Sequence, residues 1–219
     1  CHSSKIGYFY LFTLIFMPEK TYIALTIGAL FQREFEAIIP ILTSDDPQKE
    51  LVKEFKENKY LKIKTESARE RLLTDLRRRT KFAPDGFWEF YLTCTDCQRK
   101  LSLFFLLLNA YPVALDLQLE VVVEKWKKLE KKLVAFDLHM RLDELSTSIT
   151  QVGSWSNRTK KNVATNFLRS LKDAGLLING EINKPGPQPE SFWHYFITIG
   201  ESWFLEACLL SKTEREKLL

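Results

Sequence analysis

The chain has 219 residues, of which 45% are hydrophobic and 27% charged, and its formal net charge is +4. This composition is typical of a globular protein with a hydrophobic core, and it excludes a collagen-like chain and a polytopic membrane protein. A net charge of +4 does not identify a nucleic-acid-binding protein, so the distribution of charge matters more than its sum. The cysteines (Cys1, Cys94, Cys97 and Cys208) are too few for a disulfide scaffold and favour a reducing, cytoplasmic location.

Two apolar stretches need to be assigned before the helices. Residues 8–16 are apolar but too short to cross a bilayer, and Met17 is a plausible native start. We therefore expect residues 1–16 to be an upstream extension or added sequence. Residues 101–108 are also apolar, but Asn109 and Pro112 interrupt them, which predicts a buried core helix and no membrane partner.

Apolar residues at helical spacing, bounded by N-cap residues, Pro and Gly, predict a mainly α-helical fold. We expect a multi-helix bundle with a C-terminal winged-helix-like segment that contains a short β-hairpin. Residues 17–150 would form a helical N-terminal part and residues 151–219 the winged-helix-like part, packed together as one compact unit. The predicted helices cover residues 28–40, broken at Pro40, then 48–58, 65–81, 87–93, 97–110, 112–134, 137–145 and 157–172, with Gly153 in a loop.

The first basic segment extends from residue 59 to residue 81. It holds nine basic and three acidic residues, a local net charge of +6 that exceeds the charge of the whole chain. At ~100° per residue, Ala68, Leu72, Leu73 and Leu76 share an apolar face, and Arg79 lies near its edge, where its charged head would reach solvent. An anchored helix with cations on its other face is suited to phosphate binding, although a solvated helix face is an equally good interpretation. The candidate DNA-binding residues here are Lys62, Lys64, Arg69, Arg71, Arg77, Arg78 and Lys81.

A second basic segment begins at Ser156 or Asn157, either of which can cap a helix. Residues 158–172 carry five basic residues and no acidic one. Asn and Arg side chains suit contacts with base edges in the major groove. The candidate DNA-binding residues of this helix are Arg158, Lys160, Lys161, Asn162, Thr165, Asn166, Arg169 and Lys172.

A turn signal follows this second helix. Gly175 is well placed to end it, and Asn179-Gly180 between short apolar runs is a strong hairpin signal. The order of helix, glycine, strand, tight turn and strand matches the outline of a winged helix-turn-helix, with residues 159–172 as the recognition helix. An ordinary helix–hairpin corner whose polar face meets only water is the alternative.

The sequence gives little support for an enzyme. It has no GxSxG, P-loop or HExxH motif, and its three histidines have no matching nucleophile or carboxylate nearby. A lone Cys94-x-x-Cys97 pair lacks the second pair that structural zinc needs, so we expect no catalytic residue, metal, cofactor or small-molecule substrate. Aromatic residues between 185 and 219 are expected to pack as core, with a partner-binding patch as the alternative.

The order and spacing of several segments between Met17 and Ile178 resemble the BrxA family of bacteriophage-exclusion (BREX) systems. These segments are 20–31 with Glu34, 57–71 with 75–79, Tyr111-Pro112 with Asp116, 123–126, Trp155-Ser156 with 159–161, and 174–176. The resemblance implies a small helical protein similar to the antitermination factor NusB, non-enzymatic, with DNA binding and a role in phage defence. The expected partners are double-stranded DNA and other BREX components. A protein–protein adaptor and an RNA-binding NusB-like protein are the alternatives.

Overall fold

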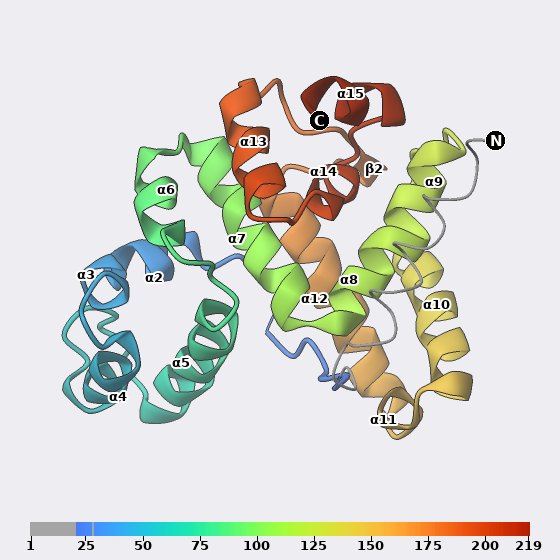
Figure 1. Cartoon of the computed structure of the whole chain (residues 1–219). Helices are drawn as coiled ribbons and strands as arrows, with labels where there is room; N and C mark the ends of the chain where they lie inside the picture. The colour runs from blue at the N-terminus through green and yellow to red at the C-terminus, as the bar shows by residue number, and fades with distance from the viewer. Residues whose placement is uncertain (1–20, 28) are drawn as a thin grey trace.

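The computed structural model describes residues 21–27 and 29–219, so the expectation for residues 1–16 lies outside the described residues. The predicted fold class is confirmed, because helices dominate and a short antiparallel hairpin lies near the C-terminus. Figure 1 shows the helices up to α5 on one side of the long helix α7 and the elements around α9 and α10 on the other.

The first described residues have no regular secondary structure. Residues 21–27 and 29–31 form a segment that we call the strap, and the first described helix begins after Phe31, whose φ of 57° is left-handed. The predicted helix over 28–40 is therefore wrong at its start. Its break is real but falls at Ile38, because Pro40 fits the first turn of the next short helix. The helices of this part are α2 (Gln32–Ala37), α3 (Ile39–Leu42), α4 (Pro47–Glu57) and α5 (Glu66–Thr80).

The centre of the core is α7 (Asp96–Ala110). Thr95 and Gln98 form a capping box at its start, and residues 101–108 are all buried, as predicted for an apolar core helix. Helix α7 packs against α2, α5, α6 (Phe87–Thr93) and α8 (Pro112–Leu117). Among the described residues, no single helix is long and apolar enough to cross a membrane; α7 and Pro112–Lys127 pass that test only as a pair bent by 113°.

The helix predicted over residues 112–134 is too long. The structure has α8, a π-helical stretch η1 (Gln118–Val123) and α9 (Glu124–Lys127) in this region, and the helix ends shortly before Leu129, which has a left-handed φ of 62°. Residues 131–133 instead run extended beside the hairpin: the Leu133 N–H donates to the Gly180 carbonyl (3.0 Å), and the Ile182 N–H donates to the Lys131 carbonyl (2.7 Å). A non-local pairing therefore replaces the last predicted turns.

The next helices are α10 (Ala135–Ser148), α11 (Thr150–Gly153) and α12 (Asn157–Asp173). Gly153 closes α11 and is therefore helical, not part of a loop. Strands β1 (Leu177–Ile178) and β2 (Glu181–Ile182) pair antiparallel, and Asn179 and Gly180 both have positive φ, as the predicted tight turn requires.

The tail packs on α6 and α7 through aromatic rings. It comprises α13 (Glu190–Thr198), α14 (Trp203–Ala207) and α15 (Lys212–Leu218). Tyr195 stacks on Phe90 with ring centroids 3.6 Å apart, and Phe196 contacts the rings of both Phe105 and Phe204. The expectation that tail aromatics belong to the core is confirmed for Phe192, Trp193, Phe196 and Phe204, which are buried.

Candidate nucleic-acid interface

Helix α12 presents a continuous exposed stripe of cationic and polar side chains. The Ser156 hydroxyl caps the helix by accepting the Thr159 N–H (3.1 Å), and Gly175 ends it with a φ of 75°. Buried Val163, Ala164 and Phe167 anchor the opposite face. At ~100° per residue, six exposed side chains fall within about 100° of arc. These six, which we call the α12 stripe, are Arg158, Lys161, Asn162, Thr165, Arg169 and Lys172.

Two residues of α12 that are predicted to bind DNA instead make hydrogen bonds to other parts of the protein. Lys160 is buried, and its ammonium donates to the Asp143 carboxylate of α10 at 2.8 Å. This bond lowers the pKa of Asp143 below its ordinary value. Asn166 is half-buried, and its amide donates to the Leu25 carbonyl of the strap at 2.8 Å. Both side chains therefore position α12, and neither joins the stripe.

We expect Lys160→Met to lower the melting temperature without changing how DNA affinity depends on salt. The substitution removes the α10–α12 ion pair, but it removes no cation that faces outward. Lys161→Met is the matched control, because the neighbouring ammonium is exposed and belongs to the stripe. Thermal unfolding and a salt series of binding measurements check both variants. A smaller salt slope for Lys160→Met would contradict the structural assignment.

The strap connects α12 to α5. The Leu30 N–H donates to the Asp173 carboxylate at the end of α12 (3.1 Å), and the Ala29 carbonyl accepts from the Arg79 guanidinium of α5 (2.8 Å). Together with the Asn166–Leu25 bond, these contacts fix the strap on both basic helices. The two basic helices, α5 and α12, are far apart in the sequence but are therefore connected through the strap.

Arg79 is the clearest departure from the sequence prediction. Its guanidinium is fully buried instead of reaching solvent, and it forms an ion pair with Asp75 at 2.7 Å, one turn earlier on α5. Burial lowers the pKa of Arg79 and raises that of Asp75, although Arg79 and the Tyr111 hydroxyl oppose the rise. Tyr111 donates to Asp75, and burial together with Asp75 raises the pKa of Tyr111 to about 12.

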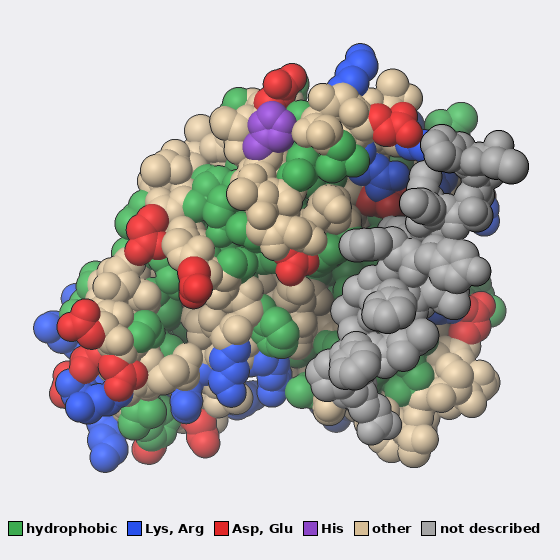
Figure 2. Space-filling view, in the orientation of Figure 1, with side chains coloured by type: hydrophobic (Ala, Val, Ile, Leu, Met, Phe, Trp, Pro, Cys, Tyr) green, Lys and Arg blue, Asp and Glu red, His purple; other side chains and the backbone are tan. Residues whose placement is uncertain are grey.

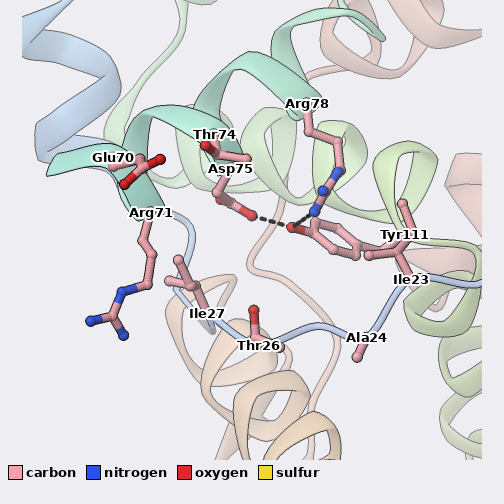
Figure 3. Close-up of a pocket in the computed structure, with 10 residues that line it drawn as sticks. All are labelled: Ile23, Ala24, Thr26, Ile27, Glu70, Arg71, Thr74, Asp75, Arg78 and Tyr111. Carbon is pink, nitrogen blue, oxygen red and sulfur yellow. Dashed lines mark hydrogen bonds between the residues drawn. The ribbon is translucent and has the colours of Figure 1, made fainter. Parts of the chain in front are cut away.

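The exposed cations of α5 are mixed with acids and internal contacts. Arg71 is exposed and contacts Ser67 (3.2 Å), whereas Arg78 is half-buried and donates to the Tyr111 hydroxyl (2.8 Å). Figure 3 shows Arg78 turned toward Tyr111 and Arg71 turned away, at a cavity of about 330 Å³ between α5 and the strap. Glu70 and Asp75 also line this cavity, so acidic and basic side chains are mixed there.

The remaining candidates near α5 vary in exposure. Arg69 is half-buried over the Phe55 ring and reaches the Ile63 carbonyl (3.4 Å), and Arg77 is half-buried beside Gln48 (3.5 Å). Lys62, Lys64 and Lys81 are exposed. Figure 2 shows Lys and Arg side chains gathered below the centre of the view, next to the region of α5. The α12 stripe is more uniform, because it contains no acidic residue.

Ion pairs connect α10 to α8 and α12 to α10. Arg141 of α10 makes two bonds to the Asp116 carboxylate of α8 (2.7 and 3.1 Å), and Lys160 joins α12 to α10. The hairpin follows α12 directly, and residues 131–133 pair with β2 as a third extended segment. Sequence reasoning missed this segment, because Lys131-Lys132-Leu133-Val134 resembles the end of a helix.

Within the part of the chain that the structure describes, no group of three or more His, Cys, Asp or Glu side chains could hold a metal ion. Cys94 is buried and Cys97 exposed. In comparisons with known proteins, the sequence matches the model of the BrxA family over residues 21–195. No protein in the curated set matches it.

Proposed function

The chain belongs to the BrxA family, which implies a component of a BREX phage-defence system, and we propose that it is a cytoplasmic, non-enzymatic protein that binds duplex DNA for that system. The observation that carries the proposal is the α12 stripe. Its four basic side chains (Arg158, Lys161, Arg169 and Lys172) are exposed, and none forms a salt bridge within the described residues, where Lys160 is the only residue of α12 that does so.

We propose that α8 to β2 form a winged-helix unit in which α12 enters the major groove. The stripe extends over about 21 Å at 1.5 Å per residue, and the major groove is wide enough, at about 12 Å, to admit one helix. The ion pairs through Asp116 and Asp143 support this assignment, because they hold the helix at a fixed angle to α10 and α8. This unit includes residues 112–150 and so extends further than the expected boundary at residue 151.

In this proposal α5 supplies supporting contacts to phosphates. Arg71 on α5 and Lys81 directly after it are exposed, and the strap joins α5 to α12. Arg78 is fixed by Tyr111 and could contact only a phosphate that approaches the cavity shown in Figure 3. We therefore expect α5 to contribute less to affinity than α12.

Direct binding of the full chain to a labelled 25-bp duplex tests the proposal. Affinity should fall steeply between 50 and 200 mM salt, because cations that neutralise phosphates release counterions. A duplex RNA of the same sequence should compete poorly, because the deep, narrow major groove of A-form RNA does not admit a helix. Tighter binding to RNA would favour the RNA-binding alternative, and no binding to either duplex would reject the proposal.

A protein–protein adaptor is the second candidate, and one observation favours it. Phe136 and Met140 at the start of α10 are 68% and 48% exposed, and Val134 is exposed beside them. Apolar side chains grouped on a surface often mark a protein contact. Co-purification with another BREX component that is lost on Phe136→Ser, combined with no DNA binding, would favour this role over the first.

A further inference from the structure

Three lysines after α9 lie outside both predicted basic segments. Lys128, Lys131 and Lys132 are exposed, and none forms a salt bridge within residues 21–27 and 29–219. Their neighbours differ: Lys125 pairs with Glu130 and Asp137, and Lys127 pairs with Glu124 and Glu206. Among the described residues, these three lysines therefore have no carboxylate within ion-pair distance.

The hairpin fixes the position of this lysine patch relative to α12. Strand β1 begins four residues after α12 ends, β2 pairs with β1, and the Ile182 N–H of β2 donates to the Lys131 carbonyl. Leu177, Ile182 and Leu133 are buried, which anchors all three segments in the core. Neighbouring strands lie about 4.8 Å apart, so residues 131–133 lie about 10 Å from β1. Figure 1 shows β2 near the end of α9.

Strand β1 packs against α12, and β2 and residues 131–133 follow beside it, so the lysines lie to the hairpin side of that helix. With α12 in a major groove, a DNA backbone borders the helix on each side. We propose that Lys128, Lys131 and Lys132 form a second phosphate-binding patch, which contacts the DNA backbone bordering the groove that α12 enters. This inference rests on the proposed binding of duplex DNA, and it names a contact beyond α5 and α12.

Acids also lie near the patch, because Lys128 lines a shallow pocket together with Glu120, Glu124, Glu130, Asp137 and Glu144. Glu181 is exposed and lies directly opposite Lys132 in the bridge between the two segments, without forming a salt bridge there. Its charge opposes phosphate binding, so Glu181→Gln should increase DNA affinity. The same substitution has no such effect if the lysines face only water.

The decisive variant is Lys128→Ala/Lys131→Ala/Lys132→Ala, compared with Lys53→Ala/Lys100→Ala/Lys127→Ala. The control removes the same charge from lysines that already have carboxylate partners. Three lost phosphate contacts reduce the salt slope by about 2.7, so from 50 to 200 mM salt the affinity of the first variant should fall about 40-fold less than that of wild type. The control should keep the wild-type slope, and thermal melting confirms that both variants fold.

A wild-type slope in the first variant, with the slope still reduced by substitutions in the α12 stripe, overturns the lysine patch and leaves the proposed function intact. Equal slopes in the variant and the control show a net-charge effect only, and they overturn the patch as well. If wild type binds no duplex at all, both the patch and the proposed function are rejected.

Discussion

Replacing Arg158, Lys161, Arg169 and Lys172 with Ala should reduce duplex DNA affinity by more than 100-fold at 50 mM salt. These four cations share one exposed face of α12, and none has a carboxylate partner within the described residues that would offset its loss. Four lost phosphate contacts should also reduce the salt slope by about 3.6. Fluorescence anisotropy on a 25-bp duplex across a salt series measures both quantities.

A control variant with the same change in net charge distinguishes direct phosphate contacts of α12 from the general attraction between a basic protein and DNA. Lys53, Lys100, Lys127 and Lys212 each pair with a carboxylate, and their replacement with Ala should change the slope little. An equal loss of affinity in both variants would show that binding depends on overall charge and not on α12. Unchanged circular dichroism would confirm that the stripe variant keeps its helix, as expected for exposed positions.

We expect Arg79→Met to lower the free energy of unfolding by about 3 to 5 kcal/mol, because it leaves the buried Asp75 without its ion-pair partner. The Ala29 carbonyl of the strap loses its donor at the same time. Urea unfolding of the full chain measures the loss. Arg78→Met, which removes a half-buried side chain bonded to the same tyrosine, should cost only about 1 kcal/mol.

The pH dependence identifies the cause of that loss. Burial already raises the pKa of Asp75, and removal of Arg79 raises it further, so in the variant the carboxyl is neutral at low pH in the folded state. A group whose pKa is higher in the folded than in the unfolded state favours folding at low pH, and this benefit is lost as pH rises through the folded pKa. The variant should therefore be closer to wild type at pH 5.5 than at pH 8.

Asp75→Asn/Arg79→Met is the matching double variant. It removes both charges and should be more stable than Arg79→Met alone at pH 8, because no uncompensated charge remains buried. Equal stability of the single and double variants would contradict this account. It would assign the loss to packing against Phe31 and Tyr111, the rings that flank the Arg79 guanidinium.

Helix boundaries set by local signals were predictable. Ser156 and Gly175 bracket α12, and Thr65 accepts the Ala68 N–H at the start of α5, each within a few residues of the helix end. The 112–134 helix was wrong because the signal that stops it is not local. Residues 131–133 pair with residues 180–182 and do not continue the helix. Lysine and leucine have good helix propensity, so their presence does not reveal this extended segment.

The candidate site was predictable only in part for the same reason. The periodicity of α12 places Arg169 and Lys172 on the face opposite the apolar one, and both are exposed in the structure. Lys160 and Asn166 have basic or polar side chains like their neighbours, but their partners lie 17 and 141 residues away. Arg79 likewise finds the Ala29 carbonyl 50 residues earlier. Helix spacing predicts which side of a helix a residue occupies. The tertiary fold determines which other residues contact that side.

The strap also has a consequence for how the protein is made. Residue 30 leaves the ribosome long before Asp173, which lies 143 residues later and accepts its N–H. At about 5 to 20 residues per second, that interval is roughly 7 to 30 s. Throughout it, the strap can meet α5 but not α12, so the relative placement of the two basic helices is completed only when most of the chain has been synthesised. Assembly of the proposed DNA-binding surface is thus a late event in biosynthesis.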